Sequence, residues 1–112
     1  MKFKKLSRKV SLRKAVLKLL VQDLILKEKI ITTEKKGKEA MKLLTFLIEK
    51  AKKKKESQRK TILKYLSGPA LTKLIYQLPA RYQERKGGYL RMIKLGRRLS
   101  DGAELCQLEL IK

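Results

Sequence analysis

Residues 89–111 read YLRMIKLGRRLSDGAELCQLELI, and this stretch decides the fold class of the 112-residue chain. Apolar and polar residues alternate over 89–97 and again over 104–111, with the turn signal Ser100-Asp101-Gly102 between them. This pattern predicts a C-terminal β-hairpin whose second strand places Cys106, Leu108 and Leu110 on one face. A two-stranded hairpin is marginally stable alone, so we expect helices from the preceding sequence to cover this face.

The sequence before the hairpin supplies those helices and one further strand. Leucine-rich segments with helical spacing predict four helices: residues 12–27, residue 34 to the lysine run 52–55, residues 57–66 and residues 69–78. The β-branched stretch 29–33 predicts a short strand between the first two. Ser11 and Thr33 are the expected N-caps of these two helices, and Pro79 is expected to end the fourth. The predicted class is therefore α/β (α+β), in a single domain of residues 11–112.

Charge is the main indication of function. The chain carries 31 Lys and Arg against ten Asp and Glu, a net charge of +21. Such an excess weakens a compact domain through self-repulsion, and a polyanionic partner is the usual reason to retain it. Nucleic acid is the commonest such partner. Residues 1–10, MKFKKLSRKV, have no acid, and we predict a basic arm there that is extended and disordered until it binds the anion.

A second basic stretch, residues 81–98, interleaves Arg and Lys with Tyr82 and Tyr89 around Gly87-Gly88. Glycine amides can approach a phosphate closely, Arg side chains grip phosphate oxygens, and tyrosine rings can stack on bases. The alternative is an ordinary hairpin loop whose glycines only permit positive φ. The lysine run 52–55 is interpreted as a solvated helix end whose charges complement the helix dipole.

The sequence argues against catalysis. It has no His and one Cys, so Cys106 has no internal disulfide partner and no histidine base to activate it. We interpret Cys106 as a small core residue. The acids lie scattered beside Lys and Arg, so we expect no metal site, no cofactor and no small-molecule substrate. No apolar run reaches the roughly 18 residues that a membrane-spanning helix needs, and we expect no membrane partner.

Two segments resemble a known family, the bacterial large-subunit ribosomal protein L17. Thr32–Glu39, TTEKKGKE, is similar to the TT-x-x-K-A-K-E segment of that family. Arg85–Arg98, RKGGYLRMIKLGRR, resembles its R-x-GGY-x-R-I-x-K-x-G-x-R signature. The chain departs from the family pattern at Gly37, where alanine is expected, and at Ser100, where a glycine normally precedes the aspartate.

This resemblance implies a structural constituent of the ribosome. It implies helices packed on a small mixed sheet, and a place on 23S-type ribosomal RNA near the exit of the nascent-chain tunnel. Neighbouring large-subunit ribosomal proteins would be its other partners, and the bacterial-type cytoplasmic ribosome its location. The residues that we expect to bind RNA are Lys4, Lys5, Arg8, Lys9, Arg13, Lys14, Lys36, Lys38, Arg81, Arg85, Gly87, Gly88, Tyr89, Arg91, Lys94, Arg97 and Arg98. Most would neutralise phosphates, with Tyr89 stacking on a base or packing beneath them.

Two other functions fit the charge. A peripheral protein could lie on anionic lipid through its first helix, because Lys and Arg flank a Leu-rich stripe in residues 1–26. A DNA-coating protein would bind duplex DNA and structured RNA with comparable affinity, whereas a ribosomal protein would prefer a folded RNA junction.

Overall fold

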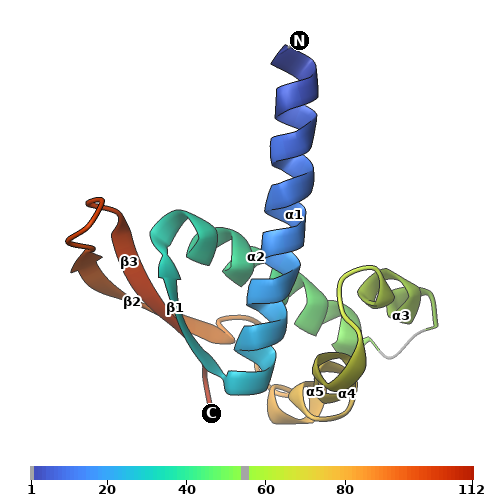
Figure 1. Cartoon of the computed structure of the whole chain (residues 1–112). Helices are drawn as coiled ribbons and strands as arrows, with labels where there is room; N and C mark the ends of the chain where they lie inside the picture. Colours follow the sequence, from blue (N-terminus) through green and yellow to red (C-terminus); the bar gives the residue numbers. More distant parts are fainter. Residues whose placement is uncertain (1, 54–55) are drawn as a thin grey trace.

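The computed structural model describes residues 2–53 and 56–112, with side chains described from residue 14 onward. Figure 1 shows a long helix, α1, with a small sheet on one side and three short helices on the other. The elements in chain order are α1 (Lys2–Lys27), β1 (Lys29–Thr33), α2 (Glu34–Lys52), α3 (Glu56–Leu63), α4 (Gly68–Tyr76), α5 (Leu78–Arg81), β2 (Leu90–Arg97) and β3 (Glu104–Leu110).

The predicted fold class is confirmed, and the C-terminal hairpin is present as β2 and β3. The sheet has three strands in the order β1-β3-β2. Ile30 pairs with Leu108 on one side of β3, and Met92 pairs with Leu108 on the other. Both pairings are antiparallel, so the sheet is antiparallel throughout and not mixed. The reason is that the last strand inserts between β1 and β2, which run in the same direction but never pair.

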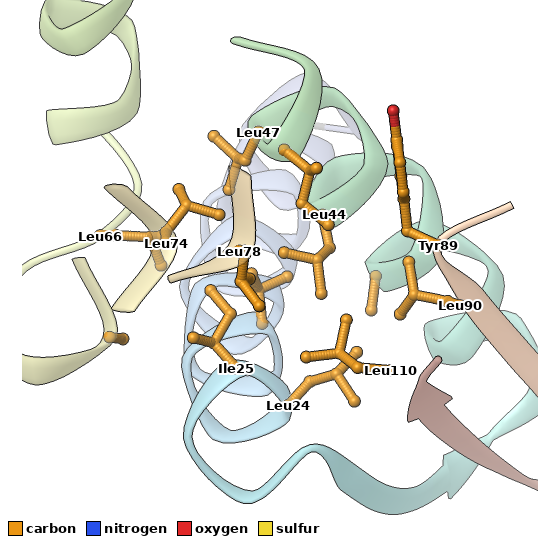
Figure 2. Close-up of a cluster of buried hydrophobic side chains, with 14 of the residues drawn as sticks. Leu24, Ile25, Leu44, Leu47, Leu66, Leu74, Leu78, Tyr89, Leu90 and Leu110 are labelled. Atoms are coloured by element: carbon orange, nitrogen blue, oxygen red, sulfur yellow. The ribbon is translucent and has the colours of Figure 1, made fainter. Parts of the chain in front are cut away.

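The core lies between the sheet and the helices. From β3 it takes Cys106, Leu108 and Leu110, the face that the alternation predicted. Its helical side is formed mainly by apolar residues of α1, α2, α4 and α5, among them Leu24, Ile25, Leu44, Leu47, Leu74 and Leu78 (Figure 2). Leu and Ile dominate this cluster, as expected for a chain with no Trp and few other aromatic residues.

The start of α1 differs from the prediction. The described backbone is helical from Lys2, so residues 2–10 are not extended, and Ser11 lies inside the helix rather than at its N-cap. This stretch contains neither Gly nor Pro, and six of its nine residues are Lys, Arg or Leu (four Lys, one Arg and one Leu), which all favour helix. The N-terminal part of α1 runs beyond the rest of the domain (Figure 1).

The ends of two other helices, α4 and α3, differ from the predicted ends. Helix α4 ends at Tyr76, and Pro79 does not stop it but lies in the first turn of α5. A proline is tolerated there because the first turn of a helix needs no hydrogen bond from its N–H. Helix α3 ends at Leu63 rather than at residue 66.

Candidate RNA-binding surface

Tyr89 follows directly after Gly87-Gly88, and its side chain is fully buried. Its hydroxyl donates to Glu49 Oε1 at 2.5 Å and accepts from Lys52 Nζ at 3.0 Å. Lys52 Nζ also donates to the carbonyl oxygen of Arg85, at 2.5 Å. Burial raises the pKa of Tyr89, and the bond to Glu49 raises it further. Figure 2 shows the hydroxyl of Tyr89 pointing away from the apolar cluster.

Tyr82 packs beside Tyr89, with ring centroids 5.1 Å apart and ring planes 44° apart. Its ring is also buried, and its hydroxyl donates to the carbonyl oxygen of Ile111. Neither ring is accessible, so the prediction that these tyrosines stack on bases is wrong. Tyr89 instead packs beneath the basic loop, which was the alternative, and the pair joins the loop to the core.

Of the two glycines in this loop, Gly88 is exposed and Gly87 is half-buried. Gly88 has φ +62°, a left-handed conformation that favours glycine. No atom lies within 4 Å of the position that a Cβ would take at either Gly87 or Gly88. The loop therefore presents open backbone above a floor fixed by Tyr89, Glu49 and Lys52, and a phosphate could approach it.

Arg81 has a structural partner that its spacing did not predict. Its guanidinium donates to both carboxylate oxygens of Glu28, at 2.7 and 3.0 Å, and Lys73 Nζ donates to the same carboxylate at 2.7 Å. The hydrogen bond from Arg81 is the main cause that lowers the pKa of Glu28 to about 2. Glu28 itself joins α1 to β1 with φ 63°, so this cluster holds an unusual backbone junction.

The hairpin carries three accessible cations among the predicted residues. Arg91, Lys94 and Arg97 are 62%, 75% and 74% exposed, and each faces one carboxylate. The distances are 3.2 Å from Arg91 to Glu109, 3.6 Å from Lys94 to Glu34 and 3.8 Å from Arg97 to Glu104. Exposed pairs of this kind are screened by water and contribute little to folding, so these cations remain available to a phosphate.

Arg98 lies in the hairpin turn and pairs with Asp101. The two bonds measure 2.8 and 3.0 Å, and the backbone N–H of Ala103 also donates to Asp101, at 3.1 Å. Arg98 is the main cause that lowers the pKa of Asp101 to about 2. The aspartate therefore orders the turn and orients Arg98.

The remaining predicted residues divide into three groups. Lys14, Lys36 and Lys38 are exposed and make no ion pair within the described part of the chain. Arg85 is exposed, and its Nη1 donates to the Gly88 carbonyl at 3.4 Å. The side chains of Lys4, Lys5, Arg8, Lys9 and Arg13 lie outside the described residues.

Sequence analysis missed Glu49 and Lys52 as parts of the loop's support. Lys52 belongs to the run interpreted as a solvated helix end, and the partners it binds lie 33 and 37 residues further along the chain. No local pattern marks such a contact. Lys54 and Lys55 of the same run lie outside the described residues.

The described residues hold no candidate metal centre. They contain no group of three or more His, Cys, Asp or Glu side chains placed to hold a metal ion. Burial raises the pKa of the Cys106 thiol, so it stays protonated and acts as a core residue. None of the helices in residues 2–53 and 56–112 is long and apolar enough to cross a membrane.

Comparisons with known proteins agree with one another. The sequence pattern of the family described as "Ribosomal protein L17" matches residues 16–111. The chain is 42% identical over 113 residues to "Large ribosomal subunit protein bL17" of Natranaerobius thermophilus, with 100% of both chains covered. It is 42% identical to the protein of that name from Borrelia hermsii, covering 97% of this chain and 89% of that one. The protein of the same name from Caldanaerobacter subterraneus is 38% identical, over 99% of this chain and all of the other.

Proposed function

The chain belongs to the ribosomal protein L17 family, and from this membership we propose that it binds 23S-type ribosomal RNA near the exit of the nascent-chain tunnel. Members of this family are structural constituents of the large ribosomal subunit and are not enzymes. Its place is accordingly the cytoplasmic, bacterial-type ribosome, and its partners are that RNA and neighbouring large-subunit proteins.

The observation that supports RNA binding is the position of the accessible cations. Lys94 of β2 lies 3.6 Å from Glu34 in the first turn of α2, so the hairpin cations adjoin the exposed Lys36 and Lys38. The hydrogen bonds of the Tyr89 hydroxyl with Glu49 and Lys52 hold the Gly87-Gly88 backbone next to β2. These groups lie on a folded body, which would hold converging RNA strands at one spacing while its charges reduce their repulsion.

The basic N-terminal segment would add a second contact. Residues 1–10 carry no acid, and the helix to which residues 2–10 belong extends beyond the domain (Figure 1). We infer that this segment enters RNA as a helix, with its cations spaced along the phosphate backbone. Residues 11–112 would form the domain that positions it.

The test compares two variants with equal loss of charge in sedimented large subunits. One replaces Arg91, Lys94 and Arg97 with alanine, and the other replaces Lys27, Lys64 and Lys112, which are also exposed. We expect the first variant to leave the large-subunit fraction at a lower salt concentration than the wild-type chain, and the second to behave like the wild type. Equal loss from both variants would reduce the proposal to nonspecific charge attraction.

Footprinting of the ribosomal RNA in the same fractions locates the contact. We expect protected nucleotides to cluster around the tunnel exit and to lose protection in the hairpin variant. Binding of the free chain to duplex DNA as tightly as to large-subunit RNA, without such a footprint, would favour the DNA-coating alternative.

A further inference from the structure

Residues of α2, α3, α4 and α5 line a surface groove. Figure 1 shows the three short helices α3, α4 and α5 on the side of α1 away from the sheet. Its volume is about 390 Å³. Ala51, Ile62 and Pro79 form a floor of buried apolar side chains. A cavity of this size falls within the range of small-ligand sites in proteins and is large enough for a nucleotide.

The groove holds the most exposed aromatic ring among the described side chains. Tyr76, the last residue of α4, is 67% exposed, and its hydroxyl makes no hydrogen bond within the described part of the chain. Tyr82 and Tyr89, by contrast, are buried with bonded hydroxyls. The Tyr76 ring is therefore not packed in the core as the rings of Tyr82 and Tyr89 are, and the face of the Tyr76 ring is free for a ligand.

Charged groups surround this ring in a pattern that suits a nucleotide. Lys50 and Arg59 line the groove, and neither makes an ion pair among the described residues. Glu56 also lines it. Proteins bind single-stranded RNA by stacking bases on aromatic rings while cations hold the phosphates. A carboxylate can accept a hydrogen bond from a base amino group.

We propose that this groove holds one unpaired nucleotide of large-subunit ribosomal RNA. Tyr76 stacks on the base, Lys50 and Arg59 bind the adjacent phosphates, and Glu56 accepts from an exocyclic amino group. The inference rests on the proposed function, and it adds an RNA contact on the side opposite the hairpin. The chain would then bridge two RNA segments rather than cover one.

Crosslinking within assembled large subunits is the direct test. Tyr76→p-benzoylphenylalanine places a photoreactive aromatic group in the groove, and nuclease and protease digestion show what it captures. We expect a crosslink to one RNA nucleotide. A crosslink to a neighbouring protein alone, or none at all from subunits that contain the variant, would overturn the proposal.

Chemical probing of the RNA 2′-hydroxyl groups provides a second measurement. We expect one nucleotide to become about fivefold or more reactive in subunits carrying Tyr76→Ala or Arg59→Gln, because stacking and phosphate contacts restrict it. Tyr76→Phe keeps the ring and should leave that nucleotide protected. Leu63→Ala, an exposed residue of α3 that does not line the groove, is the matched control and should change nothing.

The two proposals fail differently. If Tyr76→Ala subunits contain the chain but no nucleotide distinguishes Tyr76→Ala from Tyr76→Phe, the groove binds no nucleotide and ribosomal RNA binding elsewhere stands. If the wild-type chain is absent from the large-subunit fraction, the proposed function fails as well.

Discussion

The two ends of the sheet use charged residues in different ways. At one end, which we call the anchored end, Glu28 binds Lys73 and Arg81, 45 and 53 residues away in sequence. At the other, the turn end, Arg98 pairs with Asp101, three residues away. Both ends contain a bidentate Arg–carboxylate pair. Only the anchored pair joins distant segments, so only that pair should stabilise the fold, and the turn end keeps its cations for a partner.

The largest effect should come from neutralising the anchored carboxylate. Glu28→Gln leaves Lys73 and Arg81 close together without a counter-charge, in a partly shielded site. We expect the free energy of unfolding to fall by about 2 kcal/mol, after allowing for partial solvent screening. Urea titration at neutral pH measures it. An unchanged unfolding midpoint would show that the two ends do not differ.

Acid should remove the same contribution from the wild-type chain. The pKa of Glu28 is lowered from 4.5 to about 2 in the folded state, chiefly by its bond to Arg81. A lowered folded-state pKa stabilises the fold above the unfolded value and loses that effect as pH falls toward the folded one. We therefore expect the stability difference between wild type and Glu28→Gln to shrink between about pH 5 and pH 2. A difference that is constant over this interval would contradict the assignment.

The contrast also explains what could be predicted from the sequence. The hairpin and the buried face of β3 follow local alternation, the strand at 29–33 follows its β-branched residues, and all three are confirmed. The partner of Arg81, the support from Lys52 and the burial of Tyr89 depend on residues far away in the chain. The spacing of basic residues over 81–98 is the same whether an arginine there pairs with a carboxylate of the protein or with a phosphate. This spacing therefore does not distinguish a structural arginine from one that binds RNA.

The predictions of a mixed sheet and of an extended N-terminal arm were wrong for related reasons. The insertion of β3 between β1 and β2 depends on which faces pack against α1 and α2, and alternation alone does not specify a neighbour. High charge suggested an extended arm at residues 1–10, yet the Lys and Arg residues that carry this charge also favour helix, and the backbone is helical from Lys2. Charge density is informative about a partner and much less informative about backbone conformation.

Gly37 of α2 lies against the middle of β3, between the anchored end and the turn end. A substitution at Gly37 tests the packing at this contact. A Cβ at position 37 would lie 2.6 Å from Cys106 Sγ and 3.3 Å from Met92 Cε, so glycine at this position makes room for the cysteine. We expect Gly37→Ala to lower the free energy of unfolding by about 1 kcal/mol, because the steric cost exceeds the usual gain of alanine in a helix.

Cys106→Ala provides the control for that prediction. If the clash is the cause, the double variant Gly37→Ala/Cys106→Ala should be less destabilised than the sum of the two single variants. Thermal unfolding of all three variants and the wild type gives this coupling directly. Strict additivity would mean that the alanine is accommodated elsewhere, with no conflict at Cys106.

The smallest effect on folding is expected at the turn end. The pKa of Asp101 is lowered to about 2, the same value as for Glu28, and its main cause is also an arginine. Arg98 and Asp101, however, are exposed and three residues apart, so water screens them and the pair can also form in the unfolded chain. Arg98→Ala should therefore leave the unfolding midpoint unchanged while lowering the salt concentration at which the chain leaves the large subunit. If it unfolds the hairpin instead, measured as faster amide exchange in β2 and β3, the turn end is also part of the fold's support, and its cations are not reserved for RNA.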